Sequence, residues 1–422
     1  MFLKGGKEII VPMKSLRGLY RIGPGPSSSH TIGPHLAAMS FLAHSQRQNP
    51  DSYRAVFYGS LAYTGIGHSS VESVRAAFAP KPCEVVLDKT TKVEHPLTMK
   101  FVALKNGSPV DEATYLSLGG GEVHSDDDPS INEKEIYPFS NFEEIKTYLK
   151  ENNCANLKDF CLRFEDQSIE DYLLLCTKKM FSCIENGLER TGKIPANSNP
   201  RLQLNRVSGD IYRTASSMNH EDGRNTLLMT AYAYSVAESN ACGETVVTAP
   251  TCGASGIVPA VLYFEHKQRR VPLTKIKDAL YVGGIFGNIV KQNSSIAGSV
   301  GGCQAEVGTA SSMAAAALCF LHGLSLYQTE YAAECAMEHF LGLSCDPVDG
   351  YVMIPCIERN GIGAGRAYTS FLYAKSIAPI RTNQVHFDDV VKAMKLTGDS
   401  LDEEYKETGL GGLAKVLSPK NC

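Results

Sequence analysis

The sequence predicts a two-part protein of α+β class, with an N-terminal α/β domain and a C-terminal all-helical domain. Residues 1–150 mix short β-like runs with glycine-rich and acidic turn segments such as GGGEVHSDDDPSINEKE. From residue 151 onward, long stretches rich in Ala, Leu and Met have the apolar spacing of helices. Because 422 residues exceed one ordinary hydrophobic core, we expect two domains, 1–150 and 151–422.

The expected elements follow from local patterns. In the first domain the β-like runs are AVFYGSLAYTG (55–65), CEVVLD (83–88) and TMKFVALKNG (98–107), with a helix over HTIGPHLAAMSFLAHSQ (30–46). In the second domain several helical stretches end at glycine, as expected for helix C-termini. These stretches cover 169–188, 224–241, 309–323, 329–342 and 387–398.

Composition excludes several classes of partner. The net charge of −4 gives no support for binding nucleic acid or an acidic membrane. The N-terminus lacks the apolar stretch of a signal peptide, and no run of about 18 apolar residues occurs. We therefore expect a cytoplasmic protein that acts on a small molecule, with no nucleic acid and no membrane.

Three of the thirteen cysteines lie in unusual surroundings. Cys303, Cys345 and Cys356 fall in Gly- and Pro-rich segments between helices, where irregular backbone is commonly tolerated at ligand sites. The absence of CxxC argues against a zinc ribbon or a ferredoxin-type cluster. Three separated thiolates suit a cofactor held by three loops, such as a [4Fe–4S] cubane with one open iron. From the residues alone, three buried loop cysteines remain the alternative.

The segment GPGPSSSHTIGP is the second group of polar residues. Its consecutive hydroxyls lead into the expected helix and form a candidate site for a carboxylate or phosphate. An ordinary helix cap with spare serines is the alternative, and the histidine favours function because it can carry protons near neutral pH. The residues concerned are Ser27, Ser28, Ser29, His30 and Thr31. His68 follows a glycine-rich turn, and SLGGGEV (117–123) is a flexible loop.

Together these stretches resemble the iron–sulfur-dependent L-serine dehydratases of bacteria, in the single-chain form with the β domain before the α domain. The resemblance runs from GPGPSSSHTIGP through VVTAPTCGASGIVPAVL, GGCQAEVGTASSMAAAAL and MEHFLGLSCDPVDGYVMIPCIERN to YKETGLGGLA. It implies a [4Fe–4S] cluster on Cys303, Cys345 and Cys356, and conversion of L-serine to pyruvate and ammonia. It also implies a homodimer whose first domain resembles the allosteric substrate-binding domain of some phosphoglycerate dehydrogenases.

The resemblance suggests roles for further residues. His68 is expected to transfer the proton, with His30 as its competitor. Glu306 is a candidate to orient the cluster loop or the substrate amine, and Cys422 is expected to act as a fourth, displaceable cluster ligand. Substrate binding is expected from Ser27, Ser28, Ser29 and Thr31, with Arg359 and Asn360 as candidates for the substrate carboxylate or for support of the cluster.

Two segments depart from the family pattern. Cys252 and Ser255 stand where Asn and Cys are more usual, which puts substrate choice in doubt, and Asp349 stands where a small residue is commoner. Three alternatives stay open: threonine, cysteine or another β-substituted amino acid as substrate, a non-catalytic cluster-bearing sensor, and a pyridoxal-phosphate dehydratase. The last needs a Schiff-base lysine, and Lys275, Lys277 and Lys291 lie in no recognisable context for one.

Overall fold

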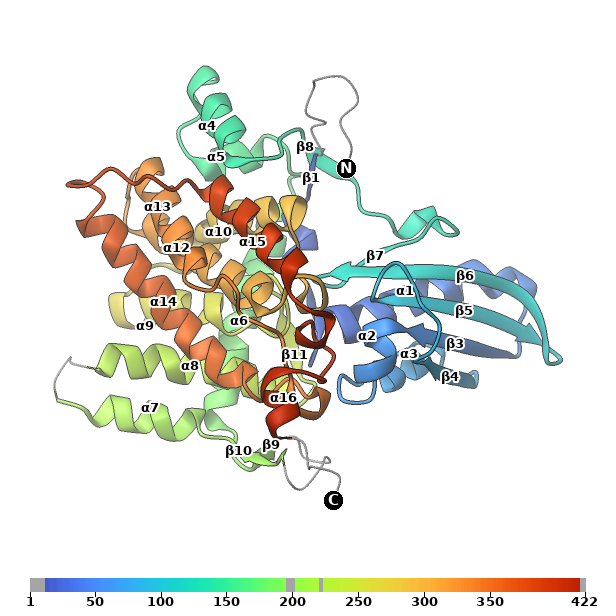
Figure 1. Cartoon of the computed structure of the whole chain (residues 1–422). Helices are drawn as coiled ribbons and strands as arrows, with labels where there is room; N and C mark the ends of the chain where they lie inside the picture. The colour runs from blue at the N-terminus through green and yellow to red at the C-terminus, as the bar shows by residue number, and fades with distance from the viewer. Residues whose placement is uncertain (1–11, 195–201, 220–222, 418–422) are drawn as a thin grey trace.

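The computed structural model describes residues 12–194, 202–219 and 223–417, and it has two unlike parts. A sheet with its helices stands beside a larger helical part (Figure 1). The α+β class is therefore confirmed, while the division at residue 150 stays a prediction. Within the described ranges, no helix combines the length and apolar character that a bilayer crossing requires.

The sheet part contains five strands in the order β4–β3–β5–β6–β7. β3 runs parallel to β4 and antiparallel to β5, and the remaining neighbours are antiparallel. In β3, Tyr53, Ala55 and Phe57 are buried and alternate with more exposed residues, as a strand with one covered face requires. The strands are β3 (Ser52–Tyr58), β4 (Cys83–Asp88), β5 (Thr98–Lys105), β6 (Ser108–Gly119) and β7 (Glu122–His124).

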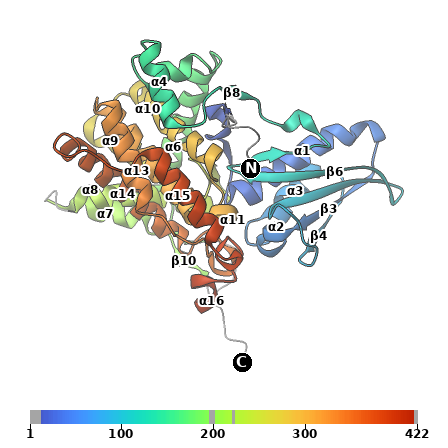
Figure 2. The same cartoon turned by 45° about the horizontal axis from the view of Figure 1, so that its top comes forward.

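Three helices accompany the sheet: α1 (Gly33–Ser45), α2 (Gly59–Thr64) and α3 (Ser70–Phe78). Phe41 of α1 lies with its ring centroid 5.9 Å from Phe101 and 6.4 Å from Phe78, so aromatic rings hold this layer together. Both views place α2 at the end of the sheet nearest the helical part (Figures 1 and 2). The β-like run predicted over 55–65 is wrong beyond Tyr58. There Gly59 adopts a left-handed backbone with φ +53° and the chain turns into α2.

The helical part is organised around α12, whose residues Thr309 to Cys319 are all buried. Small residues allow close packing, since a Cβ built on Gly283 of α10 would lie 2.7 Å from the Met313 carbonyl oxygen. The predicted helical stretches are confirmed. The helices are α4 (Phe142–Glu151), α5 (Leu157–Leu162), α6 (Ile169–Glu189), α7 (Ser208–Ser217), α8 (Arg224–Ala241), α9 (Ile257–Arg269), α10 (Leu273–Asn293), α11 (Gly298–Gly301), α12 (Thr309–Leu321), α13 (Leu326–Glu338), α14 (Cys356–Ser376), α15 (Phe387–Ser400) and α16 (Gly412–Leu417).

Short strand pairs also occur, and the strands at 193–194, 204–205 and 245–247 correct the all-helical prediction for 151–422. Two- and three-residue strands are too short to show a sequence period. The pairs are β1 (Met13–Lys14) with β8 (Glu135–Tyr137), β2 (Ile22–Pro24) with β11 (Thr245–Val247), and β9 (Lys193–Ile194) with β10 (Leu204–Asn205). The β2–β11 pair joins the segment before SSSHT directly to the helical part. Tyr20 reinforces this junction by donating to the Leu280 carbonyl at 3.0 Å.

Candidate active site and metal centre

His30 lies on a single turn of π-helix, Ser28–Ile32, that leads into α1. The predicted serine cap is confirmed, since the Ser27 hydroxyl accepts a hydrogen bond from the His30 backbone N–H. The His30 ring is fully buried, with Nδ1 3.0 Å from the Ser29 hydroxyl and Nε2 2.9 Å from the Ser60 hydroxyl. Both nitrogens of His30 are therefore engaged.

His68 comes to His30 from the turn after α2. The two ring centroids lie 4.4 Å apart, and the Thr31 hydroxyl donates to the His68 carbonyl at 2.6 Å. The His68 ring is buried, and neither of its nitrogens has a hydrogen-bond partner among the described residues. The structure thus brings the two predicted histidines together and leaves His68 with a free ring.

Burial keeps both rings neutral near pH 7. It lowers the pKa of His68 to about 3, and the nearby Thr64 backbone opposes the shift only in part. Burial, and then the neighbouring His68, lower the pKa of His30 well below its usual range. A neutral imidazole with an unengaged nitrogen is able to accept a proton from a bound molecule.

Glu407 connects the histidines to the helical part, and the sequence analysis did not single it out. Its Oε1 lies 3.6 Å from His30 Nδ1 and 3.7 Å from His68 Nε2. Its backbone N–H donates to the Cys345 carbonyl at 2.8 Å, and its carbonyl accepts from the Ser60 hydroxyl at 3.1 Å. The motif YKETGLGG offered only a glycine-rich segment as a signal, so the carboxylate was missed.

The three predicted cysteines lie near Glu407 and Glu306. Cys303 precedes the π-helical turn Gln304–Gly308, Cys345 lies in a loop, and Cys356 begins α14. The Cys303 sulfur lies 3.9 Å from Glu306 Oε2, and the ligand atoms of Cys303, Glu306 and Cys345 all lie within 4.8 Å of one another. Cys303 also influences the ionisation of both other thiols, as expected for neighbouring sulfurs.

Gly298 forms a cradle beside these groups. A Cβ built on this glycine would lie 2.9 Å from the Cys345 sulfur, 2.9 Å from Glu306 Oε2 and 3.3 Å from Glu407 Oε2. The atoms of three functional side chains therefore meet over one backbone position that has no side chain of its own. Thiolate donors gathered in this way fit an iron–sulfur cluster, which cysteines ligate through sulfur.

The raised pKa values of the thiols and carboxyl groups here also favour a bound cation. The Cys303 thiol and burial raise the pKa of Cys345 well above its usual range, and burial and Cys303 do the same for Cys356. Burial also raises the pKa of Glu306 and, together with Glu306 itself, that of Glu407. Gathering so many acidic groups is costly without a cation, and bound iron would supply the positive charge.

Arg359 is the guanidinium beside the three sulfurs. Burial opposes its charge, but Cys303, Cys356, Cys345 and Asp346 outweigh burial and raise the pKa of Arg359. Its side chain donates to the Ser344 carbonyl at 2.8 Å and to Asp346 Oδ1 at 3.2 Å. These bonds fix the loop that carries Cys345, so the guanidinium is already engaged.

Asn360 is likewise engaged on every side. Its Nδ2 donates to the Gly253 carbonyl at 2.7 Å and to the Cys356 carbonyl at 2.8 Å, and its Oδ1 accepts from the Gly256 N–H at 2.9 Å. Asn360 is buried, and it ties the TCGASG segment to the start of α14. This geometry favours support of the site over contact with a substrate.

One cavity lies between the two groups of side chains. It is lined by Ser27 and His68 from the sheet part, by Glu306 and Glu407, by Cys345 and Cys356, and by Pro26, Gly253, Pro347 and Val352. Its volume is about 10 Å³, room for about one water molecule, so an amino acid enters only if the lining side chains separate. It would then contact a serine hydroxyl, a neutral imidazole, two carboxyl groups and two of the predicted cysteines. The other expected hydroxyls lie behind this surface, where the Ser28 oxygen accepts from the Cys252 N–H at 3.4 Å.

The structure shows the surroundings of Cys252, of Asp349 and of the lysines considered for a pyridoxal-phosphate site. Cys252 is buried, and burial and then Glu306 raise the pKa of its thiol, which disfavours a thiolate. Asp349 is exposed, so solvent screens its charge from the cysteines. Lys277 pairs with Glu170 at 2.7 Å and Lys291 with Glu122 at 2.5 Å, away from the cavity lining. The lysines therefore give no support to a pyridoxal-phosphate site.

Two family models together match residues 15–414, which include all the described site residues. Residues 15–86 match the serine dehydratase beta chain, and residues 86–414 match the serine dehydratase alpha chain.

The chain belongs to the serine dehydratase family. It is 35% identical to the L-serine dehydratase of Streptomyces coelicolor, over 95% of this chain and 98% of that protein. It is 33% identical to the L-serine dehydratase of Helicobacter pylori strain J99 and 34% identical to L-serine dehydratase 2 of Escherichia coli K12, in each case over 96% of this chain and 99% of the relative. The protein is therefore an enzyme of the lyase class, with the β region before the α region in one chain.

The site draws residues from both family regions. His30 and His68 fall in the beta-chain match, whereas Glu306, Glu407 and the three cysteines fall in the alpha-chain match. Cys422 lies outside the described residues, so its predicted role as a cluster ligand stays a prediction.

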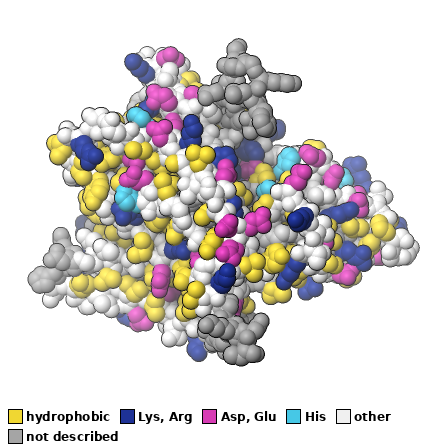
Figure 3. Space-filling view, in the orientation of Figure 1, with side chains coloured by type: hydrophobic (Ala, Val, Ile, Leu, Met, Phe, Trp, Pro, Cys, Tyr) yellow, Lys and Arg dark blue, Asp and Glu magenta, His cyan; other side chains and the backbone are white. Residues whose placement is uncertain are grey.

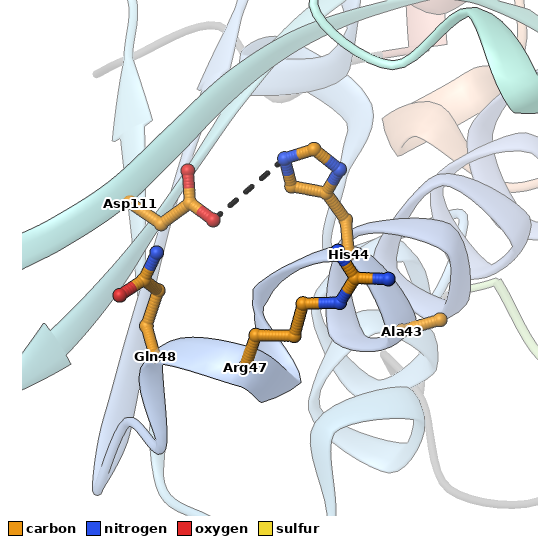
Figure 4. Close-up of a pocket in the computed structure, with 5 residues that line it drawn as sticks. All are labelled: Ala43, His44, Arg47, Gln48 and Asp111. Atoms are coloured by element: carbon orange, nitrogen blue, oxygen red, sulfur yellow. Dashed lines mark ion pairs between the residues drawn. The ribbon is translucent and has the colours of Figure 1, made fainter.

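A second pocket of this serine dehydratase lies on the sheet part, beside α1 and β6 (Figure 4). Its volume is about 340 Å³, and it is lined by Ala43, His44, Arg47, Gln48 and Asp111. His44 points toward Asp111, with Nε2 3.7 Å from Oδ2. None of the predicted site residues lines it, and the exposed His44 serves below as a matched control for His68.

Proposed function

We propose that the protein removes water from L-serine and releases pyruvate and ammonia. The observation that carries this proposal is the cavity in which the unpartnered His68 ring and Glu407 face the cysteine group. Relatives named L-serine dehydratase match this chain over 98% or 99% of their own length, which supports the same substrate here.

We propose a [4Fe–4S] cluster as the cofactor, held by Cys303, Cys345 and Cys356. When bound, such a cluster with one iron free of protein ligands supplies a Lewis acid for departure of the serine hydroxyl. The Gly298 cradle and the bonds of Arg359 to Ser344 and Asp346 support this ligand set.

We assign removal of the α-proton of the substrate to His68. Its nitrogens are free of partners within the described chain and its imidazole is neutral, whereas both nitrogens of His30 contact serine hydroxyls. His30 then orients the pair through Ser60 and Glu407. Transfer of the α-proton to His68 and cleavage of the Cβ–O bond give aminoacrylate, and the departing hydroxide takes up a proton and leaves as water. The aminoacrylate tautomerises to an imine, which a water molecule hydrolyses to pyruvate and ammonia.

Substrate binding is assigned to the SSSHT segment. Ser27 lines the cavity, so its hydroxyl is the one in position to contact the substrate carboxylate. Ser28, Ser29 and Thr31 hold the surrounding backbone and rings in place through Cys252, His30 and His68 respectively. We assign Arg359 and Asn360 to support of the cluster loops.

The test is anaerobic reconstitution with iron and sulfide, followed by assays of keto acid and ammonia from L-serine, L-threonine and L-cysteine. We expect turnover of L-serine, a loss of about 100-fold or more for His68→Asn, and no loss for His44→Asn, whose ring is exposed. Failure of fully reconstituted protein to form keto acid from any of the three amino acids would refute the proposal, and would favour a cluster-bearing sensor.

We propose that Cys422 would serve as a fourth, displaceable thiol ligand of the cluster when no substrate is bound. Deletion of Cys422 should leave the iron content unchanged while altering the resting absorption spectrum and the onset of turnover. Unchanged spectra and kinetics would make the terminal thiol idle.

The proposal also covers the fold of the sheet part, the cellular location and the oligomeric state. We propose that the sheet part has the fold of the allosteric substrate-binding domain of some phosphoglycerate dehydrogenases, supported by its mixed five-stranded sheet with helices. We also propose a cytoplasmic homodimer. Superposition of an experimental structure, cell fractionation and sedimentation analysis test these three statements.

A further inference from the structure

Four side chains with metal-binding chemistry lie at the C-terminal end of α13, apart from the active-site cavity. They are Glu334, Cys335, Glu338 and His339, and none of them lines that cavity. Cys335 and His339 are four residues apart, as are Glu334 and Glu338, so each pair shares one face of the helix. Figure 3 shows acidic and histidine side chains close together over this region of the helical part.

The geometry of this group suits a single ion. One ligand atom each from Cys335, Glu338 and His339 lie within 4.8 Å of one another. His339 Nδ1 donates to the Cys335 carbonyl at 2.7 Å and lies 3.3 Å from Glu338 Oε1, so the ring would offer an ion the lone pair of Nε2. Metal-binding histidines commonly have their other ring N–H held by a carbonyl in this way.

Glu334 gives an independent indication. Its carboxyl group is 2% exposed, and only Oε2 has a donor, the Asn383 side chain at 2.9 Å. The buried Oε1 has no hydrogen-bond donor among the described residues. Glu334 lines a cavity of about 310 Å³ together with Cys335, Glu338 and His339. A buried carboxylate oxygen without a donor beside a second carboxylate is a costly arrangement that a cation relieves.

The surroundings contain both signs of charge. Arg381 lines the cavity, and Glu330 lies nearby on α13, where it pairs with Lys146 at 3.1 Å. Glu330 is paired with Lys146, Arg381 faces Glu334 and Glu338, and the Arg366 guanidinium acts on Cys335. Burial and then Glu338 raise the pKa of Glu334 to about 8, so a bound cation would displace a proton from Glu334 as well as from Cys335.

We propose that Cys335, Glu338 and His339, with Glu334, bind one divalent transition-metal ion of the zinc type. A thiolate, an imidazole and carboxylate oxygens are the donors that Zn²⁺ takes in proteins, whereas Mg²⁺ and Ca²⁺ prefer oxygen alone. Binding displaces the Cys335 thiol proton to solvent, and no electron is transferred. The ion would link α13 to the 381–385 segment through Glu334 and Asn383.

The test measures zinc bound by the full chain. Wild-type protein with its cluster reconstituted is dialysed against Zn²⁺ under anaerobic conditions, and bound zinc and iron are counted by mass spectrometry. We expect one zinc per chain that His339→Ala and Cys335→Ser each lose, while iron content and turnover stay unchanged. His44→Ala, which removes a histidine of similar exposure that also lies near a carboxylate, should keep the zinc.

Addition of Co²⁺ provides a second readout, because a thiolate–cobalt absorption band should appear in wild type and be absent in Cys335→Ser. His339 is partly exposed, so His339→Ala keeps the test valid even if Cys335→Ser fails to fold. If no cluster assembles, the difference between wild type and His339→Ala still isolates this ion, because both retain the same other cysteines. Equal zinc in wild type and His339→Ala, or no bound zinc in wild type, would overturn the proposal.

Discussion

Replacement of Gly298 by alanine tests the proposed cluster site at a single backbone position. The added methyl would lie 2.9 Å from the Cys345 sulfur, whereas ordinary contacts begin at 3.4 Å. The sulfur must therefore retreat by about 0.5 Å, more than twice the roughly 0.2 Å tolerance of a metal–ligand distance. Gly298 begins α11 and is not among the glycines with positive φ, so alanine adds no backbone strain there. We expect Gly298→Ala to lose most of its iron after reconstitution while it stays folded.

Gly365 of α14 supplies the control on the helix that carries Cys356. A Cβ built on Gly365 meets nothing within 4 Å, so Gly365→Ala should bind full iron and gain about 0.5–1 kcal/mol in unfolding free energy. Iron and sulfide analysis after anaerobic reconstitution, with thermal unfolding followed by circular dichroism, compares the two variants. Full iron and normal turnover in Gly298→Ala would refute the assignment of Cys345 and its neighbours as the cluster site.

Three further predictions concern neighbouring residues. The folded chain holds His68 and His30 neutral, so protons bind preferentially to the unfolded chain below about pH 6.5. The unfolding free energy should therefore fall as the pH is lowered toward about 3, by up to about 1.4 kcal/mol per pH unit for each histidine. Urea unfolding of the cluster-free chain should show a smaller pH slope in His68→Asn, and an equal slope would contradict this. Arg359→Leu should lower iron retention, with partial recovery in Arg359→Lys, and a change in KM alone would instead indicate substrate contact. Cys252→Ala should keep full iron, because burial keeps that thiol protonated, and loss of iron would identify Cys252 as a ligand.

The sequence predicted the parts of the site that have distinctive composition. Cysteines in Gly- and Pro-rich segments, and a histidine within three serines and a threonine, are uncommon enough to identify from one chain. Their meeting was not predictable from spacing, because it depends on how α2 and the Cys345 loop pack against each other. The strand error over 55–65 has a local cause, since the apolar residues after Gly59 fit a short strand and a short helix equally well.

The sequence did not predict the contacts that Glu407 and Arg359 make in the structure. A glutamate among glycines and a threonine has no pattern that separates a surface residue from a buried partner of two histidines. Arg359 suggested a carboxylate site by its charge, yet its geometry is fixed by the Ser344 carbonyl and Asp346. In both residues the deciding information is a tertiary contact.

The contact between Ser60 and Glu407 has a consequence for how the enzyme is made. The Ser60 hydroxyl bonds to the carbonyl of a residue 347 positions further along the chain, and the same segment pairs with Cys345. At typical rates of translation, the ribosome needs tens of seconds to add that many residues. The sheet part has time to fold while it waits, but its histidines meet the cysteines only after nearly the whole polypeptide has emerged. Prematurely terminated chains would lack this closing segment, so the proposed cluster would find a complete site only in a nearly full-length chain.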